Sequence, residues 1–232
     1  MLLKIPNFLA LIKVNTMQTI NQPITRRESI KKILKLSGGI ALAGSPALPF
    51  SLPGSVLADT GQASFIIDAK GQTPGYAIRD LTRKTFDAAG GIQKFISKGD
   101  VVVIKPNISW ARAPQLAATT HPEVLKSVIE LCQEAGAKKI RIADHTIHGA
   151  RRCFAVTGAG SVAKKTGTDL VFPRSSLMRD MKLNGHRLDV WPVFTPIVEA
   201  DKLINLPVAK VHSLSGLTLG MKNWIGAVGG RR

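Results

Sequence analysis

Polar side chains follow two apolar runs of the chain at positions where strands would end. Lys105 and Asn107 come directly after residues 101–104, and Asp144 comes directly after residues 140–143. In open α/β sheets, ligands bind outside the carboxyl ends of the strands. Lys105 and Asn107 therefore predict a site for an anion or a carbonyl group. A lysine that reaches solvent from a strand end and an asparagine that turns the chain would explain the same pattern.

A second group of cationic, hydroxyl and amide side chains follows the apolar residues 203–206. Its members are Lys210, His212, Ser213, Thr218, Lys222 and Asn223. We interpret the group as the other half of the same ligand site, because cations and hydroxyls gather there among small residues. If residues 217–225 are helical, Thr218 and Lys222 lie four positions apart on one helix face. A packed glycine-rich loop with incidental polar groups is the alternative.

Proton transfer in such a site needs a titratable side chain within reach of the ligand. His121, Asp144 and His212 are the residues that we expect to act as acids or bases. Asp144 is also followed by His145 and His148, a combination that can bind a metal or carry out acid–base chemistry. Histidines in loops are more often solvated or hydrogen-bonded, and we predict no metal ligand.

The two cysteines, Cys132 and Cys153, do not form a Cys-x-x-Cys pair. Closely spaced cysteines are what zinc ribbons and iron–sulfur clusters require. We therefore expect no iron–sulfur cluster from this chain alone, and the cofactor stays unknown. Cys132 lies at an apolar position of a predicted helix and fits a core. A disulfide between the two stays open for an oxidising compartment.

The elements that would hold these residues predict an α/β fold, a mostly parallel sheet with flanking helices. Residues 101–104 are apolar without interruption, which indicates a strand buried on both faces, and Pro106 ends it. A helix is predicted from about Thr120 to Ala135, with Thr120 and Glu123 as a capping box. Its first N–H groups would lie near the end of the strand, which favours an anion there.

Weaker patterns predict the remaining elements of residues 59–232. They are strands at residues 63–68, 169–172 and 203–210, the last interrupted by Pro207; helices at residues 76–89 and 161–165; and a β-hairpin over residues 183–193. No further element follows the glycine-rich residues near position 230. We therefore expect a domain that is incomplete at its C-terminus.

Residues 1–58 have the parts of a twin-arginine export signal in the right order. Arg26 and Arg27 stand in a Thr-Arg-Arg-Glu-Ser-Ile-Lys stretch, followed by a moderately apolar run at residues 33–43 and small residues before a cleavage point near Asp59. That run is too short to span a bilayer. Met17 as the start would give a leader of more usual length. We expect periplasmic export by the twin-arginine translocase, with membrane contact through this segment alone; a basic amphipathic helix on a membrane is the alternative.

The chain of 232 residues carries a formal net charge of +17, of which residues 59–232 hold +11. A surface with this charge attracts anions, so an anionic small molecule or cofactor is the expected partner. A solvated basic exterior would look the same. Nucleic acid is not an expected partner, because no binding motif, basic helix or aromatic platform accompanies the charge.

Several motifs resemble the family named domain of unknown function 362. They are Gly90-Gly91-Ile92, the stretch from Lys98 to Asn107, Thr119-Thr120-His121-Pro122-Glu123-Val124, Glu134-Ala135-Gly136-Ala137, Lys210-Val211-His212-Ser213 and Gly220-Met221-Lys222-Asn223-Trp224-Ile225-Gly226. The resemblance covers roughly residues 65–230 and implies no settled activity. Some members carry a ferredoxin-like module and some carry twin-arginine leaders. This chain has the leader pattern without a cysteine cluster, so the iron–sulfur role is not carried over.

These observations predict an exported protein that binds an anionic small molecule or cofactor. Whether it is an enzyme stays open. One alternative is a redox-associated enzyme that uses the lysines to hold its ligand. The other is a non-catalytic periplasmic binding protein with the same residues.

Overall fold

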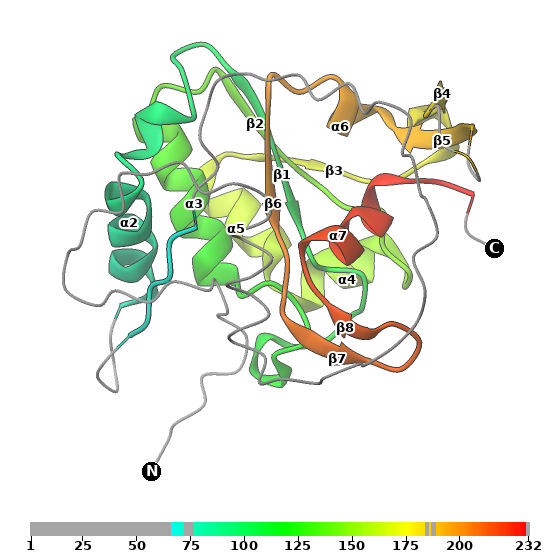
Figure 1. Ribbon diagram of the computed structural model, residues 1–232, viewed down its shortest axis with the longest axis horizontal. Helices are drawn as coiled ribbons and strands as arrows, with labels where there is room; N and C mark the ends of the chain where they lie inside the picture. The colour runs from blue at the N-terminus through cyan, green and yellow to red at the C-terminus, as the bar shows by residue number, and fades with distance from the viewer. Residues whose placement is uncertain (1–65, 72–76, 184–185, 187–188, 231–232) are drawn as a thin grey trace, which may run out of the picture. The chain divides into compact units, whose positions relative to one another are not determined.

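The structure is a computed structural model, which describes residues 66–71, 77–183, 186 and 189–230. Four parallel strands form its central sheet in the order β3-β2-β1-β6 (Figure 1). They are β1 (Val101–Pro106), β2 (Lys139–Ala143), β3 (Asp169–Val171) and β6 (Lys202–Leu206). The predicted α/β class with a parallel sheet is confirmed.

Helices pack on one face of this sheet and enclose the larger apolar core. They are α2 (Ile78–Ala88), α3 (Pro122–Glu134), α4 (Ala150–Val156) and α5 (Ala159–Thr166). Val102 and Ile104 of β1 belong to this core together with Leu125 and Ile129 of α3. The helices predicted at residues 76–89 and 161–165 correspond to α2 and α5, and β3 matches the predicted strand at 169–172.

The opposite face of the sheet carries a smaller core made by Val103, Ala143 and Phe194. Phe194 ends β5 (Val190–Phe194), which pairs antiparallel with β4 (Met178–Lys182) and is followed by α6 (Thr195–Val198). Because Val103 is fully buried here and its neighbours are buried in the larger core, β1 is covered on both faces, as its apolar run predicted. A hairpin was predicted over residues 183–193; the structure has one, but β4 lies before that span and only β5 overlaps it.

A second hairpin follows β6, and it corrects two predictions. It consists of β7 (Lys210–His212) and β8 (Gly216–Thr218), followed by α7 (Gly220–Asn223) and the 3-10 helix η4 (Trp224–Ala227). Of the helix considered over residues 217–225, residues 220–225 are helical in α7 and η4, whereas residues 217 and 218 belong to β8 and pair with β7. Thr218 and Lys222 therefore do not lie on one helix face. The strand predicted over residues 203–210 is in fact two strands, since Pro207 cannot donate to a ladder.

The start of α3 differs from the predicted capping box. His121 is the N-cap, and its Nδ1 accepts a hydrogen bond from the Glu123 N–H at 3.2 Å. Pro122 occupies the first helical turn and favours the extended backbone that His121 adopts. The Thr120 hydroxyl is occupied elsewhere: it accepts from the Asn107 N–H at 2.8 Å and donates to the Leu206 carbonyl at 2.7 Å.

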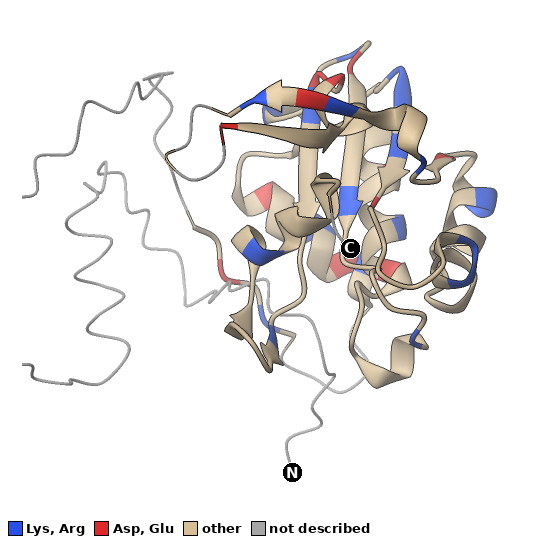
Figure 2. Ribbon diagram, turned by 90° about the vertical axis from the view of Figure 1, so that its right-hand side faces the viewer, with Lys and Arg blue, Asp and Glu red and all other residues tan. Residues whose placement is uncertain are grey.

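The remaining short elements are the 3-10 helices η1 (Ile92–Lys94), η2 (Pro114–Leu116) and η3 (Ser175–Leu177). Residues 66–68 are irregular and not the end of a strand, while residues 63–65 and the leader at 1–58 lie outside the described residues. Lys and Arg residues are spread over several helices and hairpins (Figure 2). In the described part of the chain, no helix has the length and apolar character needed to cross a bilayer.

The strand order creates a switch point between β1 and β6. The chain leaves β1 toward β2 and β3 on one side and returns to β6 on the other. In sheets of this kind, a ligand crevice opens at the carboxyl ends of the two strands that flank the switch point. Lys105 and Asn205 are register partners near these ends.

Candidate functional site

The centre of the switch point is an ion pair between Lys105 and Asp144. The Lys105 ammonium lies 2.7 Å from Asp144 Oδ1, and neither side chain is exposed to solvent. The ammonium also donates to the Pro106 carbonyl at 2.8 Å, and Asp144 Oδ2 accepts from the Ile108 N–H at 3.0 Å. The pair thus joins the ends of β1 and β2, and its two charges compensate each other where water is excluded.

Two asparagines extend this buried network from β6 to α7. Asn223 Oδ1 accepts from the Lys105 ammonium at 3.2 Å, and Asn223 Nδ2 donates to Asn205 Oδ1 at 2.7 Å. Asn205 Nδ2 donates in turn to the Gly220 carbonyl at 3.0 Å. The network therefore fixes the short helix α7 onto the carboxyl ends of β1 and β6.

The backbone of Gly226 packs directly against the ion pair. A Cβ atom on Gly226 would lie 2.5 Å from Lys105 Nζ and even closer to Asp144 Oδ1. The Gly226 carbonyl accepts a hydrogen bond from the His145 N–H at 2.8 Å, which holds the segment in place. Only a residue without a side chain allows the backbone to approach the pair this closely.

Two further lysines, Lys210 and Lys222, lie outside this buried network. Lys210 of β7 is half-buried, and its ammonium donates to Asn107 Oδ1 at 3.2 Å and to the Ala118 carbonyl. Burial is the main cause that lowers the pKa of Lys210, and the positive charge of Lys222 lowers it further, although Asp144 acts in the opposite direction. In the described residues, neither Lys210 nor Lys222 forms an ion pair with a carboxylate.

His212 lies beside Lys222 on the inner side of the hairpin. Its Nδ1 accepts from the N–H groups of Leu214 at 3.1 Å and Ser215 at 3.3 Å, so we assign the proton of the neutral ring to Nε2. Nε2 lies 3.2 Å from the Lys222 ammonium. With this tautomer, two hydrogen-bond donors face each other, an arrangement that an anionic oxygen would satisfy on both sides.

Two buried hydroxyls adjoin the contacts of Lys210. Thr218 is the register partner of Lys210 in the hairpin, and Thr119 follows Ala118, whose carbonyl accepts from Lys210. Both Thr119 and Thr218 are almost fully buried, and their Oγ1 atoms have no hydrogen-bond partner among the described residues. Buried hydroxyls normally have a partner, so both require an explanation.

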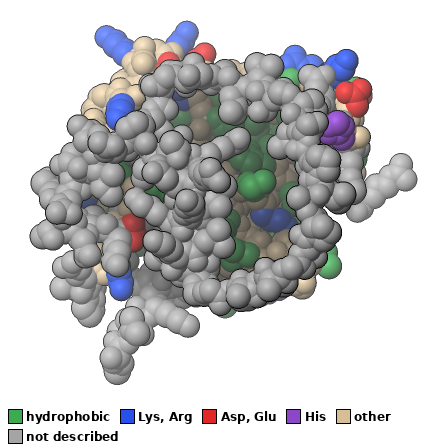
Figure 3. Space-filling model, viewed as in Figure 1, with side chains coloured by type: hydrophobic (Ala, Val, Ile, Leu, Met, Phe, Trp, Pro, Cys, Tyr) green, Lys and Arg blue, Asp and Glu red, His purple; other side chains and the backbone are tan. Residues whose placement is uncertain are grey.

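The remaining residues predicted for the site lie at its margin. His121 is half-buried, and burial lowers the pKa of its imidazole, although the nearby Glu123 acts in the opposite direction. Ser213 is exposed in the connection between β7 and β8. The described side chains visible at the centre of the face seen in Figure 1 are hydrophobic, with a basic one beside them (Figure 3).

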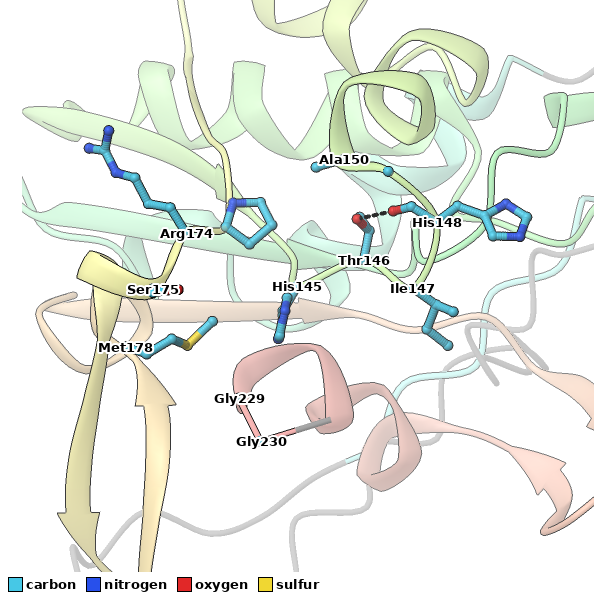
Figure 4. A pocket seen from close by; sticks show the side chains of 12 residues that line it. His145, Thr146, Ile147, His148, Ala150, Arg174, Ser175, Met178, Gly229 and Gly230 are labelled. Atoms are coloured by element: carbon cyan, nitrogen blue, oxygen red, sulfur yellow. Dashed lines mark hydrogen bonds between the residues drawn. The ribbon is translucent and has the colours of Figure 1, made fainter. Parts of the chain in front are cut away.

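A separate pocket of about 470 Å³ opens at the carboxyl ends of β2 and β3. Figure 4 shows His145 at its centre, directed toward the segment that contains Gly229, with Ser175 and Met178 beside it. His145 Nδ1 lies 2.7 Å from the Val228 carbonyl, which fixes the orientation of the ring. The pocket therefore shares the C-terminal segment with the ion pair but has its own lining.

Both cysteines are free and buried. Burial raises the pKa of the Cys132 thiol to about 12, so this thiol is inert in the core between α3 and the sheet. Cys153 contacts the carbonyls of Ser109 and His148, each at 3.5 Å. Among residues 66–71, 77–183, 186 and 189–230, no three His, Cys, Asp or Glu side chains gather as a metal ion would require.

A family model described as "Domain of unknown function (DUF362)" matches residues 102–232, which is more than half of the chain. The chain belongs to this family. The matched DUF362 region begins in β1 and contains both halves of the candidate site. A relative, the thylakoid-associated protein of Synechocystis sp., is 29% identical over 156 residues, which make up 64% of this chain and 46% of the relative. The DUF362 chain thus spans about half the length of this relative, and no solved structure matches it.

The sequence pointed neither to one residue of the buried network nor to part of the separate pocket's lining. Asn205 belongs to the buried network, and a polar residue inside the apolar run 203–206 was the signal that could have revealed it. Arg174, Ser175 and Met178 line the separate pocket, but they come from a connection without any motif. That Lys105 pairs with Asp144 was also hidden, because the two residues are 39 positions apart in sequence.

Proposed function

We propose that this protein binds an anionic small molecule or cofactor at the switch point, between the end of β1 and the inner side of the β7–β8 hairpin. The observation that carries the proposal is the pair of half-buried lysines, Lys210 and Lys222, without a carboxylate partner in the described residues. Lys105 lies beneath this site in its buried ion pair and does not itself contact the ligand. A carboxylate or phosphate group is the ligand chemistry that two ammonium groups and a histidine N–H recognise.

Two further observations support an anionic ligand. The donors of Lys222 and His212 lie 3.2 Å apart, so an acceptor that bridges both from the side would satisfy them together. The unpartnered hydroxyl of Thr218, the register partner of Lys210, would donate to the same group. Ligand oxygens would therefore satisfy polar atoms that the described residues leave without partners.

Unfolding temperature in the presence of anions tests this proposal, because a ligand that binds only the native state stabilises it. The probes are inorganic phosphate and citrate, added at constant ionic strength. We expect both Lys210→Met and Lys222→Met to reduce the stabilisation that the wild type shows. Lys202→Met is the matched control, because it removes the same charge from an exposed position at the other end of β6. Equal stabilisation of all four proteins would refute the site.

Turnover separates an enzyme from a binding protein. His212 is the acid or base that we propose for an enzyme, since its Nε2 faces the ligand side of the hairpin. A panel of metabolites that carry carboxylate or phosphate groups is incubated with wild type and His212→Gln. Product formation by the wild type alone would favour the enzyme, whereas anion binding without product from either protein would favour the non-catalytic alternative.

We also propose that residues 1–58 direct periplasmic export by the twin-arginine route. The support is the arginine pair followed by an apolar run and small residues, together with a relative that is associated with thylakoids, a membrane location. Replacement of Arg26 and Arg27 by lysine keeps the charge and should retain the protein inside the cell. The control is replacement of Lys32 and Lys35 by arginine, which follow both possible starts, and equal export of both variants would exclude this route.

A further inference from the structure

Lys105 and Lys210 differ in the acceptors that surround their nitrogen atoms. Lys105 Nζ donates to the Pro106 carbonyl, to Asp144 and to Asn223, which gives each N–H of an ammonium an acceptor. Among the described residues, Lys210 Nζ has two acceptors, Asn107 Oδ1 at 3.2 Å and the Ala118 carbonyl, and both are uncharged. A neutral amine has two N–H donors and one lone pair. The contacts of Lys210 therefore match the neutral amine, with the lone pair directed away from the two acceptors.

The charges around Lys210 also favour the neutral amine. Burial and the positive charge of Lys222 lower its pKa, while Asp144 acts in the opposite direction. The Asp144 carboxylate is itself paired with the Lys105 ammonium. A lysine that is partly buried beside a second cation is a familiar form of nucleophilic lysine, because more of it is unprotonated near neutral pH.

Three further polar side chains lie on the inner side of the β7–β8 hairpin with Lys210. His212 is two positions further along β7, and Thr218 is the register partner of Lys210, so both side chains project from the same side. Lys222 follows in α7, which packs against β8, and its Nζ lies 3.2 Å from His212 Nε2. A nucleophilic amine is thus combined with two donors that fit a carboxylate.

We propose that Lys210 forms a Schiff base with a 2-oxo acid. The carboxylate of the substrate binds to Lys222 and His212, and the carbonyl carbon next to it meets Lys210 Nζ. A 2-oxo acid fits because its carbonyl carbon is bonded directly to its carboxylate. The proposal rests on the proposed anion site and names the substrate class of that site.

The reaction at Lys210 is a condensation that needs no oxidant or reductant. The lone pair of Nζ attacks the carbonyl carbon, a C–N bond forms, and the carbonyl π electrons move to the oxygen. One N–H proton passes to this oxygen and gives a carbinolamine. The second N–H proton then leaves with the hydroxyl group as water, and the C–N bond becomes double. The hydroxyl of Thr218, which has no partner among the described residues, is the group that hydrogen-bonds the departing oxygen.

Reductive trapping in the full chain tests the proposal. Pyruvate is added with sodium cyanoborohydride, which reduces an imine to a stable secondary amine, and peptide mass spectrometry measures the labelling rate of each lysine. We expect Lys210 to gain a carboxyethyl group roughly tenfold or more faster than the exposed Lys202, because the site holds the carbonyl carbon beside the amine. Acetone has the carbonyl group without the carboxylate, so most of this preference should disappear with acetone.

Two variants separate the nucleophile from the charge around it. Lys210→Arg keeps a cation in the site, so inorganic phosphate should still raise its unfolding temperature, but the fast labelling phase should be absent. Lys222→Met should slow the labelling of Lys210 toward the rate of Lys202. Lys182→Met is the matched control, because it removes an exposed lysine from β4 and should leave the labelling of Lys210 unchanged.

The decisive result comes from the wild type and does not depend on how the variants fold. Labelling of Lys210 by pyruvate that is no faster than that of Lys202 would overturn the Schiff base. If phosphate stabilises the same protein, the anion site stands without this chemistry, whereas the absence of both effects removes the anion site as well. An equally large preference for Lys210 with acetone would overturn the 2-oxo acid as the substrate class.

Discussion

At the scale of single residues, Lys105 illustrates how burial changes the meaning of a charge. A lysine at the end of a strand suggests a contact with ligand, but this ammonium is enclosed with the Asp144 carboxylate. Buried ion pairs add little net stability compared with apolar residues, whereas a lone buried charge is costly. The pair therefore serves to hold the ends of β1 and β2 and the helix α7 in one arrangement.

Removal of one member of this pair should destabilise the protein strongly. We expect Lys105→Met or Asp144→Leu alone to reduce the free energy of unfolding by about 3–5 kcal/mol, since each leaves a buried charge without its partner. The double variant Lys105→Met with Asp144→Leu should lose less than the sum of the two. Urea unfolding of the four proteins measures this, and additive losses would show that the two side chains do not interact.

Gly226 should tolerate no side chain. Gly226→Ala places a Cβ against both members of the ion pair, so we expect a loss of about 1–3 kcal/mol or more from overpacking. Gly149→Ala is the control, because a Cβ there meets nothing within 4 Å. Thermal unfolding compares the two, and equal midpoints would mean that the C-terminal segment does not rest on the ion pair.

At the scale of elements, Thr120 links β1, α3 and β6. Its hydroxyl accepts from the Asn107 N–H and donates to the Leu206 carbonyl. We expect Thr120→Val to cost about 1–3 kcal/mol, because it leaves both buried backbone groups without a partner at nearly constant volume. Thr120→Ser keeps the hydroxyl and should cost less. Urea unfolding that cannot distinguish Val from Ser would disprove this link.

The start of α3 should be sensitive to pH. The pKa of His121 is lowered in the folded protein from its ordinary value of 6.5, chiefly by burial. The unfolded chain therefore binds this proton more readily, so stability from His121 is complete above about pH 6.5 and is lost as the pH falls below it. His121→Asn keeps a good N-cap without titration. The drop in unfolding temperature between pH 7.5 and pH 5 should be smaller in this variant.

The elements that sequence predicts well are those whose signal is local. The apolar run of β1, the spacing of α3 and the turn residues between β4 and β5 all lie within the segment concerned. Two departures from prediction have the opposite origin: the strand at residues 217–218, where the start of a helix was considered, and the cap expected at Thr120. Their structures depend on β7 and on Leu206, partners that local spacing does not include. The residues of the site were recognisable by type. Only the fold shows that Lys105 and Asp144 form a buried ion pair, whereas Lys210 and Lys222 lie outside it.

At the scale of the whole molecule, the two apolar cores of the described residues lie between Phe86 and Leu206. We expect a chain that begins at Asp59 to unfold within a few degrees of the full chain, because it retains every residue of these two cores. Differential scanning calorimetry of the two proteins provides the measurement. A large drop in the unfolding temperature of the shortened chain would show that residues 1–58 stabilise the domain.

The buried ion pair beneath the site joins parts of the chain that are far apart in sequence. Lys105 reaches Asn223 across 118 positions, and Gly226 comes later still. Burial of the two charges therefore depends on residues of α7 and η4, which lie far along the chain from β1 and β2. The ion pair is enclosed only where segments of very different sequence position meet.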